Sequence, residues 1–297
     1  MNRGEELLAG IELGGTKCIA VLARGETILA KQAWPTGAPA ETLAAVLGTL
    51  EGWRAQQGFV AIGIAAFGPL GLAPAASRYG HVLETTKPGW SGFDLLGSVQ
   101  ARFDLPIALD TDVAGAALAE QLWGGSVGCR VHAYVTIGTG VGGGIIVDGR
   151  PVHGFLHPEI GHMRVPRRAD DAFAGICCFH GDCVEGLVSG PALEARTGLA
   201  GADIPADHPV WADVTKELGD FFANMLMSFA PERIALGGGV LQQRPYLLPQ
   251  IRTVVTERLA GYLPDTAIAP AARIAMATLG ANAGPLGAIA LAALARG

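Results

Sequence analysis

Residues 7–22 read LLAGIELGGTKCIAVL, and residues 131–147 read VHAYVTIGTGVGGGIIV. Each segment has an apolar run, a glycine-threonine turn and a second apolar run, which is the pattern of two β-strands joined by a tight turn. A further strand follows each pair, at residues 28–34 and 151–152. The two copies are too far apart for a solenoid, whose period is ~20–50 residues. The sequence therefore predicts two related lobes that each open with an antiparallel meander.

Alternating helical and strand patterns follow each predicted meander. The spacing of apolar residues predicts helices over residues 41–57, 95–103, 113–123, 213–229, 247–259 and 285–296. Buried strands are predicted over residues 60–66, 106–109 and 233–236. Such alternation is typical of α/β lobes with mixed sheets.

The lobe boundary is expected where the first set of elements ends. We expect an N-terminal lobe over residues 1–115 and a C-terminal lobe over residues 116–284. The closing helix, about residues 285–297, could return to the N-terminal lobe. A cleft between the lobes is where ligands are expected to bind.

Composition excludes several classes of protein. The chain has 297 residues, of which 50% are hydrophobic and 16% charged, so a folded, globular protein is expected. The formal net charge of −6 argues against a nucleic-acid partner, because phosphate backbones attract basic surfaces. Glycine, with 43 residues, is present at about twice its usual share of ~7%. Tight turns and close backbone approaches are therefore expected.

We also expect neither export nor membrane insertion. The first residues carry Arg3, Glu5 and Glu6, which is unlike a signal peptide. The uncharged stretch 274–295 is as long as a bilayer span but contains turn-forming residues, so a turn and a buried helix are expected there. Three of the five cysteines lie within residues 177–183, unlike a disulfide framework. A cytoplasmic protein is expected.

Three glycine-rich turns each follow a predicted strand. They occupy residues 14–17, 138–144 and 237–239. Turns without side chains leave backbone N–H groups open to an anion, and a threonine hydroxyl adds a donor. None has the Walker spacing, and any one alone is explained by a hairpin that needs glycine. Three such turns together favour a divided nucleotide site.

Two aspartates flank a threonine at residues 110–112, between a strand and a helix. Either Asp110 or Asp112 could simply cap the helix. The functional alternative is a carboxylate that accepts a proton from a substrate hydroxyl during phosphoryl transfer. Glu12, before the first turn, is a candidate for holding Mg²⁺ through water, since hard cations prefer oxygen.

A Cys-x2-His-x2-Cys motif with a histidine 15 residues upstream predicts a metal site in the loop of residues 157–185. Thiolate and imidazole ligands at short spacing favour tetrahedral Zn²⁺. Four ligands close the site, so the zinc is expected to be structural: His162, Cys177, His180 and Cys183. Cys178 could replace Cys177. The metal would fix the loop that carries Glu159 and Glu185, whose carboxylates could bind sugar hydroxyls.

Taken in order, these motifs resemble those of the ROK family of sugar kinases and repressors, from Ile11 to the last helix. Several details are similar to the bacterial fructokinase branch of that family. These details are Glu12, Phe67-Gly68-Pro69, Lys87-Pro88-Gly89-Trp90, Thr111 and the Cys-x2-His-x2-Cys cluster.

The resemblance implies an actin/hexokinase-like α/β fold of two ribonuclease-H-like lobes and a homodimer. It implies Mg-ATP as the phosphoryl donor, with Asp112 as the general base. The residues implied for ATP are Gly14, Gly15, Thr16, Lys17, Gly138, Thr139, Gly140, Pro191, Gly237, Gly238 and Gly239. The residues implied for the sugar are Thr111, Glu159, Glu185 and His162, which is also a zinc ligand.

Phosphorylation of D-fructose to fructose 6-phosphate is the expected activity. A glucose, mannose or N-acetylmannosamine kinase of the same family is the alternative. A non-catalytic, zinc-stabilised sugar-binding protein would leave the ATP-type turns unexplained. A repressor would carry a helix-turn-helix, for which no room is expected before the turn at residue 14.

Overall fold

The computed structural model describes residues 6–264, 266 and 268–296. The described residues form two compact units. Unit 1 comprises Met1–Gly128, Gly144–Pro158 and Leu279–Gly297, and unit 2 comprises Cys129–Gly143 and Glu159–Thr278. Across the described part of the chain, we find no helix with the length and apolar character that a membrane crossing requires.

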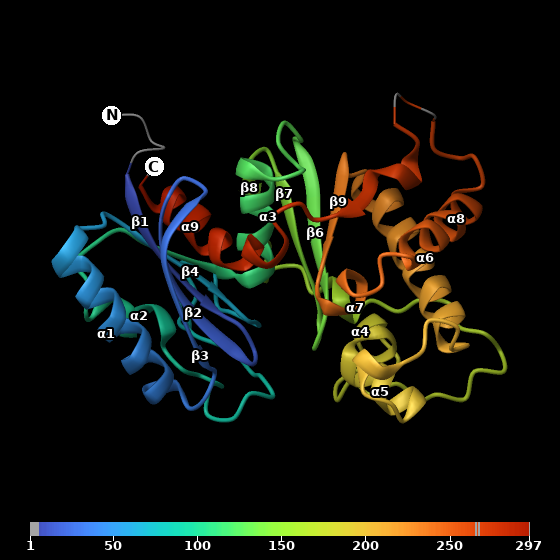
Figure 1. The fold of residues 1–297 in the computed structure, drawn as a ribbon, viewed down its shortest axis with the longest axis horizontal. Helices are drawn as coiled ribbons and strands as arrows, with labels where there is room; N and C mark the ends of the chain where they lie inside the picture. The colour runs from blue at the N-terminus through green and yellow to red at the C-terminus, as the bar shows by residue number, and fades with distance from the viewer. Residues whose placement is uncertain (1–5, 265, 267, 297) are drawn as a thin grey trace. The chain divides into compact units, whose positions relative to one another are not determined.

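Unit 1 is built on a five-stranded mixed sheet with the order β3-β2-β1-β4-β5 (Figure 1). Its strands are β1 (Leu7–Leu13), β2 (Lys17–Arg24), β3 (Thr27–Pro35), β4 (Ile62–Ala66) and β5 (Ile107–Thr111). The first three strands form the predicted antiparallel meander, whereas β4 and β5 run parallel to β1. β1, β2 and β4 are almost wholly buried, as expected of strands covered on both faces.

Helices cover both faces of this sheet. They are α1 (Pro39–Gln57), α2 (Leu95–Gln100), α3 (Asp112–Trp123) and α9 (Ala283–Ala295). Alternate residues of β1 belong to different cores: Leu7 and Ile11 pack in the cluster of α1 and α2, and Leu8 packs with Ile289 of α9. Side chains of a strand alternate between faces, so α1 and α9 lie on opposite sides of the sheet.

The C-terminal helix α9 packs so closely in unit 1 that its backbone approaches the backbones of neighbouring elements. It contacts β1, β4 and α3. A Cβ added to Gly63 of β4 would overlap the backbone of Ala288, and one added to Gly287 would overlap the backbone of Gly115 in α3. Part of the glycine excess thus serves close packing between a helix and its neighbours.

The second sheet has the order β10-β9-β6-β7-β8. Its strands are β6 (Val131–Ile137), β7 (Val141–Val147), β8 (Arg150–Pro151), β9 (Arg233–Gly237) and β10 (Ile274–Met276). β9 runs parallel to β6 and β10, and β7 pairs antiparallel with β8. The strand order repeats the meander that the sequence predicts, and the division between the units falls within β7.

The helices of unit 2 follow β8 along the chain. They are α4 (Val184–Val188), α5 (Gly190–Thr197), α6 (Val210–Phe229), α7 (Gly239–Gln242) and α8 (Leu247–Leu259). α6 packs against α4 and α8. Single 3₁₀ turns occur at Ile160–His162, Gly201–Asp203, Pro270–Arg273 and Gly280–Asn282.

The structure corrects several predicted boundaries. α2 ends at Gln100 rather than at residue 103, and α9 begins at Ala283 rather than at Pro285. β10 was not predicted, because three residues within an alanine-rich stretch carry no strand pattern of their own. Pairing with β9 defines that strand.

Candidate functional site

The candidate residues of unit 1 lie along one edge of its sheet. Leu13 of β1 is paired with Ala66 of β4, and Ala66 is paired with Thr111 of β5. The three strands are parallel, and each ends at this edge. The turn at residues 14–17 and the start of α3 at Asp112 are therefore neighbours along the edge where open α/β sheets bind ligands.

Hydrogen bonds hold the turn at residues 14–17 in place and leave two of its backbone N–H groups without an acceptor in the described part of the chain. Its first N–H donates to its last carbonyl at 3.0 Å. Thr36 supports it twice, donating its N–H to the Thr16 carbonyl at 3.0 Å and its hydroxyl to the Gly14 carbonyl at 2.8 Å. Within the described residues, the N–H groups of Gly15 and Thr16 donate to no acceptor. These groups are available to an anion.

Asp112 is the first residue of α3. Thr111, not either aspartate, caps this helix: its hydroxyl accepts the Ala114 N–H at 3.1 Å. Among the described residues, the Asp112 carboxylate forms no salt bridge. Burial raises its pKa to about 6, although the Val113 N–H donates to Oδ1 at 2.9 Å and opposes that rise. The group is thus ionised at neutral pH yet basic enough for proton transfer.

Asp110 differs from Asp112 in having its oxygens paired. Its Oδ1 accepts the Thr111 N–H at 2.7 Å, and its Oδ2 lies 3.1 Å from Nε2 of His153. That hydrogen bond raises the pKa of His153. In the same loop, Nε2 of His157 accepts the Leu70 N–H at 3.0 Å. Asp110 therefore supports the end of β5, and Asp112 is the carboxylate left for chemistry.

Glu12 carries a buried oxygen that lacks a partner. Its Oε2 forms no hydrogen bond within the described residues. Burial, and then the charge of Asp112, raise the pKa of Glu12 to about 7. The carboxylate lies against the first turn of α9, where a Cβ on Gly284 would overlap it. An unpartnered carboxylate oxygen suits a hard cation, so Glu12 fits the predicted Mg²⁺ site.

Unit 2 gathers the other three segments predicted for a nucleotide. The Gly138 carbonyl accepts the Gly190 N–H at 2.7 Å, which places the turn at residues 138–140 against the start of α5 and Pro191. A Cβ built on Gly138 would lie 3.8 Å from the nitrogen of Gly239. Gly238 has φ of +85° and approaches the Ile137 backbone so closely that a side chain would overlap it.

The two glutamates predicted for the sugar have different surroundings. Oε2 of Glu185 accepts the Val141 N–H at 3.0 Å and lies beside Gly140, where an added Cβ would come within 2.6 Å of it. Oε2 of Glu159 lies 4.0 Å from Nε2 of His162, too far for a direct hydrogen bond.

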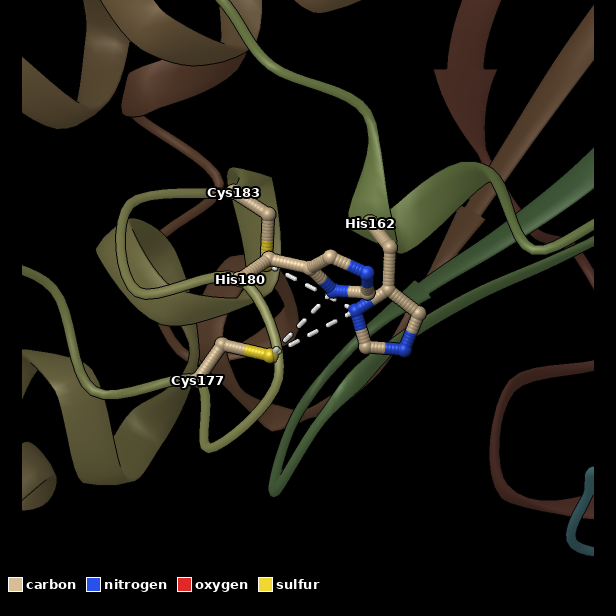
Figure 2. Close-up of side chains that lie close together, drawn as sticks. All are labelled: His162, Cys177, His180 and Cys183. Atoms are coloured by element: carbon tan, nitrogen blue, oxygen red, sulfur yellow. Dashed lines mark hydrogen bonds between the residues drawn. The ribbon is translucent and has the colours of Figure 1, made fainter.

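The four predicted metal ligands lie together in unit 2. Figure 2 shows His162, Cys177, His180 and Cys183 pointing toward a common centre, and their ligand atoms lie within 4.8 Å of one another. Cys178 is exposed and outside this group. The choice follows from a β-bridge between Cys177 and Gly181, with hydrogen bonds of 3.1 and 2.8 Å, which holds the intervening His180 over Cys177.

The distances in this cluster fit a tetrahedral ion. Cys177 Sγ lies 3.6 Å from Nδ1 of His162 and 3.7 Å from Nδ1 of His180, and Cys183 Sγ lies 3.6 Å from Nδ1 of His162. Zinc bonds of ~2.3 Å to sulfur and ~2.0 Å to nitrogen, at tetrahedral angles, separate such atoms by about 3.5 Å. Burial raises the pKa of the Cys183 thiol to about 11, so a cation would be needed to hold it as thiolate at neutral pH.

Each unit thus brings together its own share of the predicted residues. Unit 1 holds the first turn, Thr111 and Asp112, and unit 2 holds the other turns, the sugar-contact candidates and the Cys/His cluster. No role was predicted for His153, which pairs with Asp110, or for Lys87, whose side-chain end lies close to Gly15. The Lys-Pro-Gly-Trp motif is the sequence signal that includes Lys87.

Comparison with known proteins agrees with this geometry. The ROK family model matches residues 8–295. The chain is 40% identical over 291 residues to the fructokinase of Pediococcus pentosaceus, covering 96% of this chain and 97% of that one. It is 37% identical over 298 residues to the fructokinase of Zymomonas mobilis, covering 98% of each.

Solved structures share the fold. The ROK hexokinase from Thermus thermophilus superposes with a TM-score of 0.80 at 27% identity, covering 97% of this chain and 98% of that one. A ROK glucokinase from Streptomyces griseus, solved with glucose and AMPPNP, superposes with a TM-score of 0.75 at 25% identity, covering 98% and 99% of the two chains. The two mixed sheets with their helices are therefore the actin/hexokinase-like α/β fold expected from the resemblance. On its sequence, its fold and its motifs, this chain belongs to the ROK family.

Proposed function

We propose that this protein is an ATP-dependent fructokinase, which transfers the γ-phosphoryl group of ATP to D-fructose and forms fructose 6-phosphate. The observation that carries the proposal is Asp112, a carboxylate with no cation partner in the described residues, at the same sheet edge as a turn with open N–H donors. The fructokinases among its relatives, at 37–40% identity, support fructose as the acceptor.

In the proposed reaction, the chain's own residues position the substrates and move one proton. Asp112 accepts the proton of the sugar hydroxyl as the oxygen attacks the γ-phosphorus. The bond from that phosphorus to the bridging oxygen breaks, and ADP leaves with the electron pair. The turns at residues 14–17 and 138–140, with Pro191 and residues 237–239, bind the nucleotide. Glu12 would hold Mg²⁺, which would neutralise charge on the phosphates.

The sugar is proposed to contact Thr111, Glu159, His162 and Glu185. The distance of 4.0 Å between Glu159 Oε2 and His162 Nε2 is longer than a hydrogen bond, so each group can form a hydrogen bond with a sugar hydroxyl. Because the His162 Nδ1 faces the cysteine sulfurs, Nε2 is the nitrogen left for the sugar.

The Cys/His cluster is proposed to hold a structural Zn²⁺. Its four ligands leave no open position for substrate, which is typical of a structural rather than a catalytic site. The ion would fix the orientation of His162 and of the loop that carries Glu159.

Substrate preference tests the proposed function directly. With Mg-ATP and a panel of fructose, glucose, mannose and N-acetylmannosamine, fructose is expected to have the highest kcat/KM, by about tenfold or more. A coupled assay for ADP measures it. Preference for glucose or mannose would instead support the related hexose kinases, and no ATP consumption with any sugar would support the sugar-binding protein.

The pKa of Asp112 predicts how the rate depends on pH. A general base acts only when deprotonated, so kcat/KM should be constant well above pH 6 and fall about tenfold per pH unit below it. If Glu12 must also be deprotonated, its pKa of about 7 would start the fall near pH 7 and make it steeper below pH 6. Initial rates between pH 5 and pH 9 test this, and a profile that stays flat down to pH 5 would contradict the role of Asp112.

The oligomer and the compartment are also proposals. The family resemblance supports a homodimer. None of the five cysteines forms a disulfide, which supports a reducing compartment such as the cytoplasm.

A further inference from the structure

Lys87 has a half-buried side chain that nothing in the proposed reaction yet uses. Its ammonium forms no salt bridge or hydrogen bond within the described residues. Instead, the end of the Lys87 side chain packs against the turn of residues 14–17. A Cβ built on Gly15 would come within 2.9 Å of both Cε and Nζ of Lys87. An ammonium without a counter-charge, placed against a turn of the anion-binding type, points to an anionic ligand.

The loop that carries Lys87 is firmly anchored in unit 1. Trp90 is 1% exposed, and its ring packs edge-on against Phe67 with centroids 5.4 Å apart. Its backbone N–H donates to the Lys87 carbonyl at 3.2 Å, and its indole N–H donates to the Gly37 carbonyl at 3.0 Å. The Lys87 backbone is therefore fixed by the buried indole.

The same short segment anchors the turn and the lysine loop. Thr36 holds the carbonyls of Gly14 and Thr16, and its neighbour Gly37 holds Trp90. Residues 36–37 therefore anchor both segments. They keep the ammonium of Lys87 close to the open N–H groups of Gly15 and Thr16. Preorganised donors of this kind are most effective where negative charge develops in a transition state.

We propose that Lys87 binds the γ-phosphoryl group of ATP while it is transferred to the hexose. This inference rests on the proposed function. The phosphorus loses its bond to the bridging oxygen of ADP, gains a bond to the sugar oxygen, and the hydroxyl proton goes to Asp112. The three non-bridging oxygens keep their negative charge throughout, and Lys87 pairs with them. Its ammonium then acts together with the N–H groups of Gly15 and Thr16.

Replacement of Lys87 by methionine tests the proposal, because methionine retains the apolar contact with Gly15 and removes only the charge. For K87M, kcat is expected to fall about 10²- to 10³-fold, the usual loss for one transition-state donor, with KM for fructose changed by less than about threefold. K87R should regain part of the rate. R24M, which removes a charge from the exposed end of β2, is the matched control and should match the wild type.

Two outcomes would overturn the proposal: a K87M rate within about threefold of the wild type, or a raised KM for fructose with kcat unchanged. The latter would make Lys87 a sugar contact. Thermal unfolding of each variant checks that the fold is kept.

Nucleotide affinity separates this proposal from the proposed function. Titration calorimetry without sugar should show that K87M weakens ATP binding more than ADP binding, since only ATP has a γ-phosphate. That result would support Lys87 even if the wild type phosphorylated none of the four sugars. Equal losses for ATP and ADP, or no loss for either, would overturn the assignment while leaving a measured fructokinase activity intact.

Discussion

Replacing Asp112 with asparagine is expected to lower kcat by about 10²- to 10⁴-fold, the range for loss of a general base. Asparagine keeps the size of the side chain and can still accept the Val113 N–H, which Asp112 accepts at 2.9 Å. It lacks the basic oxygen that takes the hydroxyl proton. A steady-state assay with fructose and Mg-ATP measures the loss. A D112N enzyme that keeps kcat within about tenfold of the wild type would contradict the base role.

The same substitution should not weaken the fold. The pKa of Asp112 is raised from 3.8 to about 6 in the folded protein, so the charged form is disfavoured there: its cost to stability develops between these two pH values and is fully present above about pH 6. At pH 7.5 the neutral D112N variant should therefore have a Tm equal to or above that of the wild type. D104N, at an exposed position with the same change of charge, is the control for both rate and Tm. A lower Tm for D112N would mean that lost rate reflects unfolding.

Loss of the proposed metal from the Cys/His cluster is the second change for which we expect a large effect. Substitution of Cys183 by serine removes one of four ligands at a fully buried position. A structural zinc site contributes its binding free energy to folding. Because each kcal/mol of lost stability lowers the Tm by ~2–4 °C and this loss should amount to several kcal/mol, the Tm should fall on the order of 10 °C. Activity should fall with it, because His162 belongs both to the cluster and to the proposed sugar contacts.

Cys178 provides a control within the same loop. C178S changes the neighbouring, exposed thiol, which lies outside the cluster, and should retain both the proposed metal and the Tm of the wild type. Elemental analysis of the purified wild type should find zinc, and C183S should lose it. Chelation of the wild type should lower Tm and activity together. Protein purified without zinc that is fully active and stable would contradict the proposed site.

The elements that could be predicted are those with a local pattern. β6 and α8 have the predicted bounds, since their apolar periodicity ends at clear turn residues. Spacing could identify the Cys/His cluster, with one of its thiols left open, because its cysteines and His180 lie within seven residues. Choosing Cys177 over Cys178 needed the backbone bridge to Gly181.

What could not be predicted depends on residues far apart in the chain. The pair of His153 with Asp110 joins positions separated by 43 residues. Lys87 reaches Gly15 because the buried Trp90 fixes the loop that carries the lysine. No local sequence pattern predicts this contact. Similarly, the helix cap could not be assigned among three adjacent polar residues, since each is a good cap and the choice of Thr111 follows from backbone direction.

The position of α9 has a consequence for how the protein is made. This helix covers one face of the sheet that contains β1, the first strand of the chain, yet it is formed by Ala283–Ala295 near the other terminus. During synthesis, the residues of unit 2 leave the ribosome before this helix does. The unit that begins first is therefore finished last. Until Ala283–Ala295 has been synthesised, Leu8 and Val21 lack their helical cover, and the nascent chain presents an apolar sheet face to the cell.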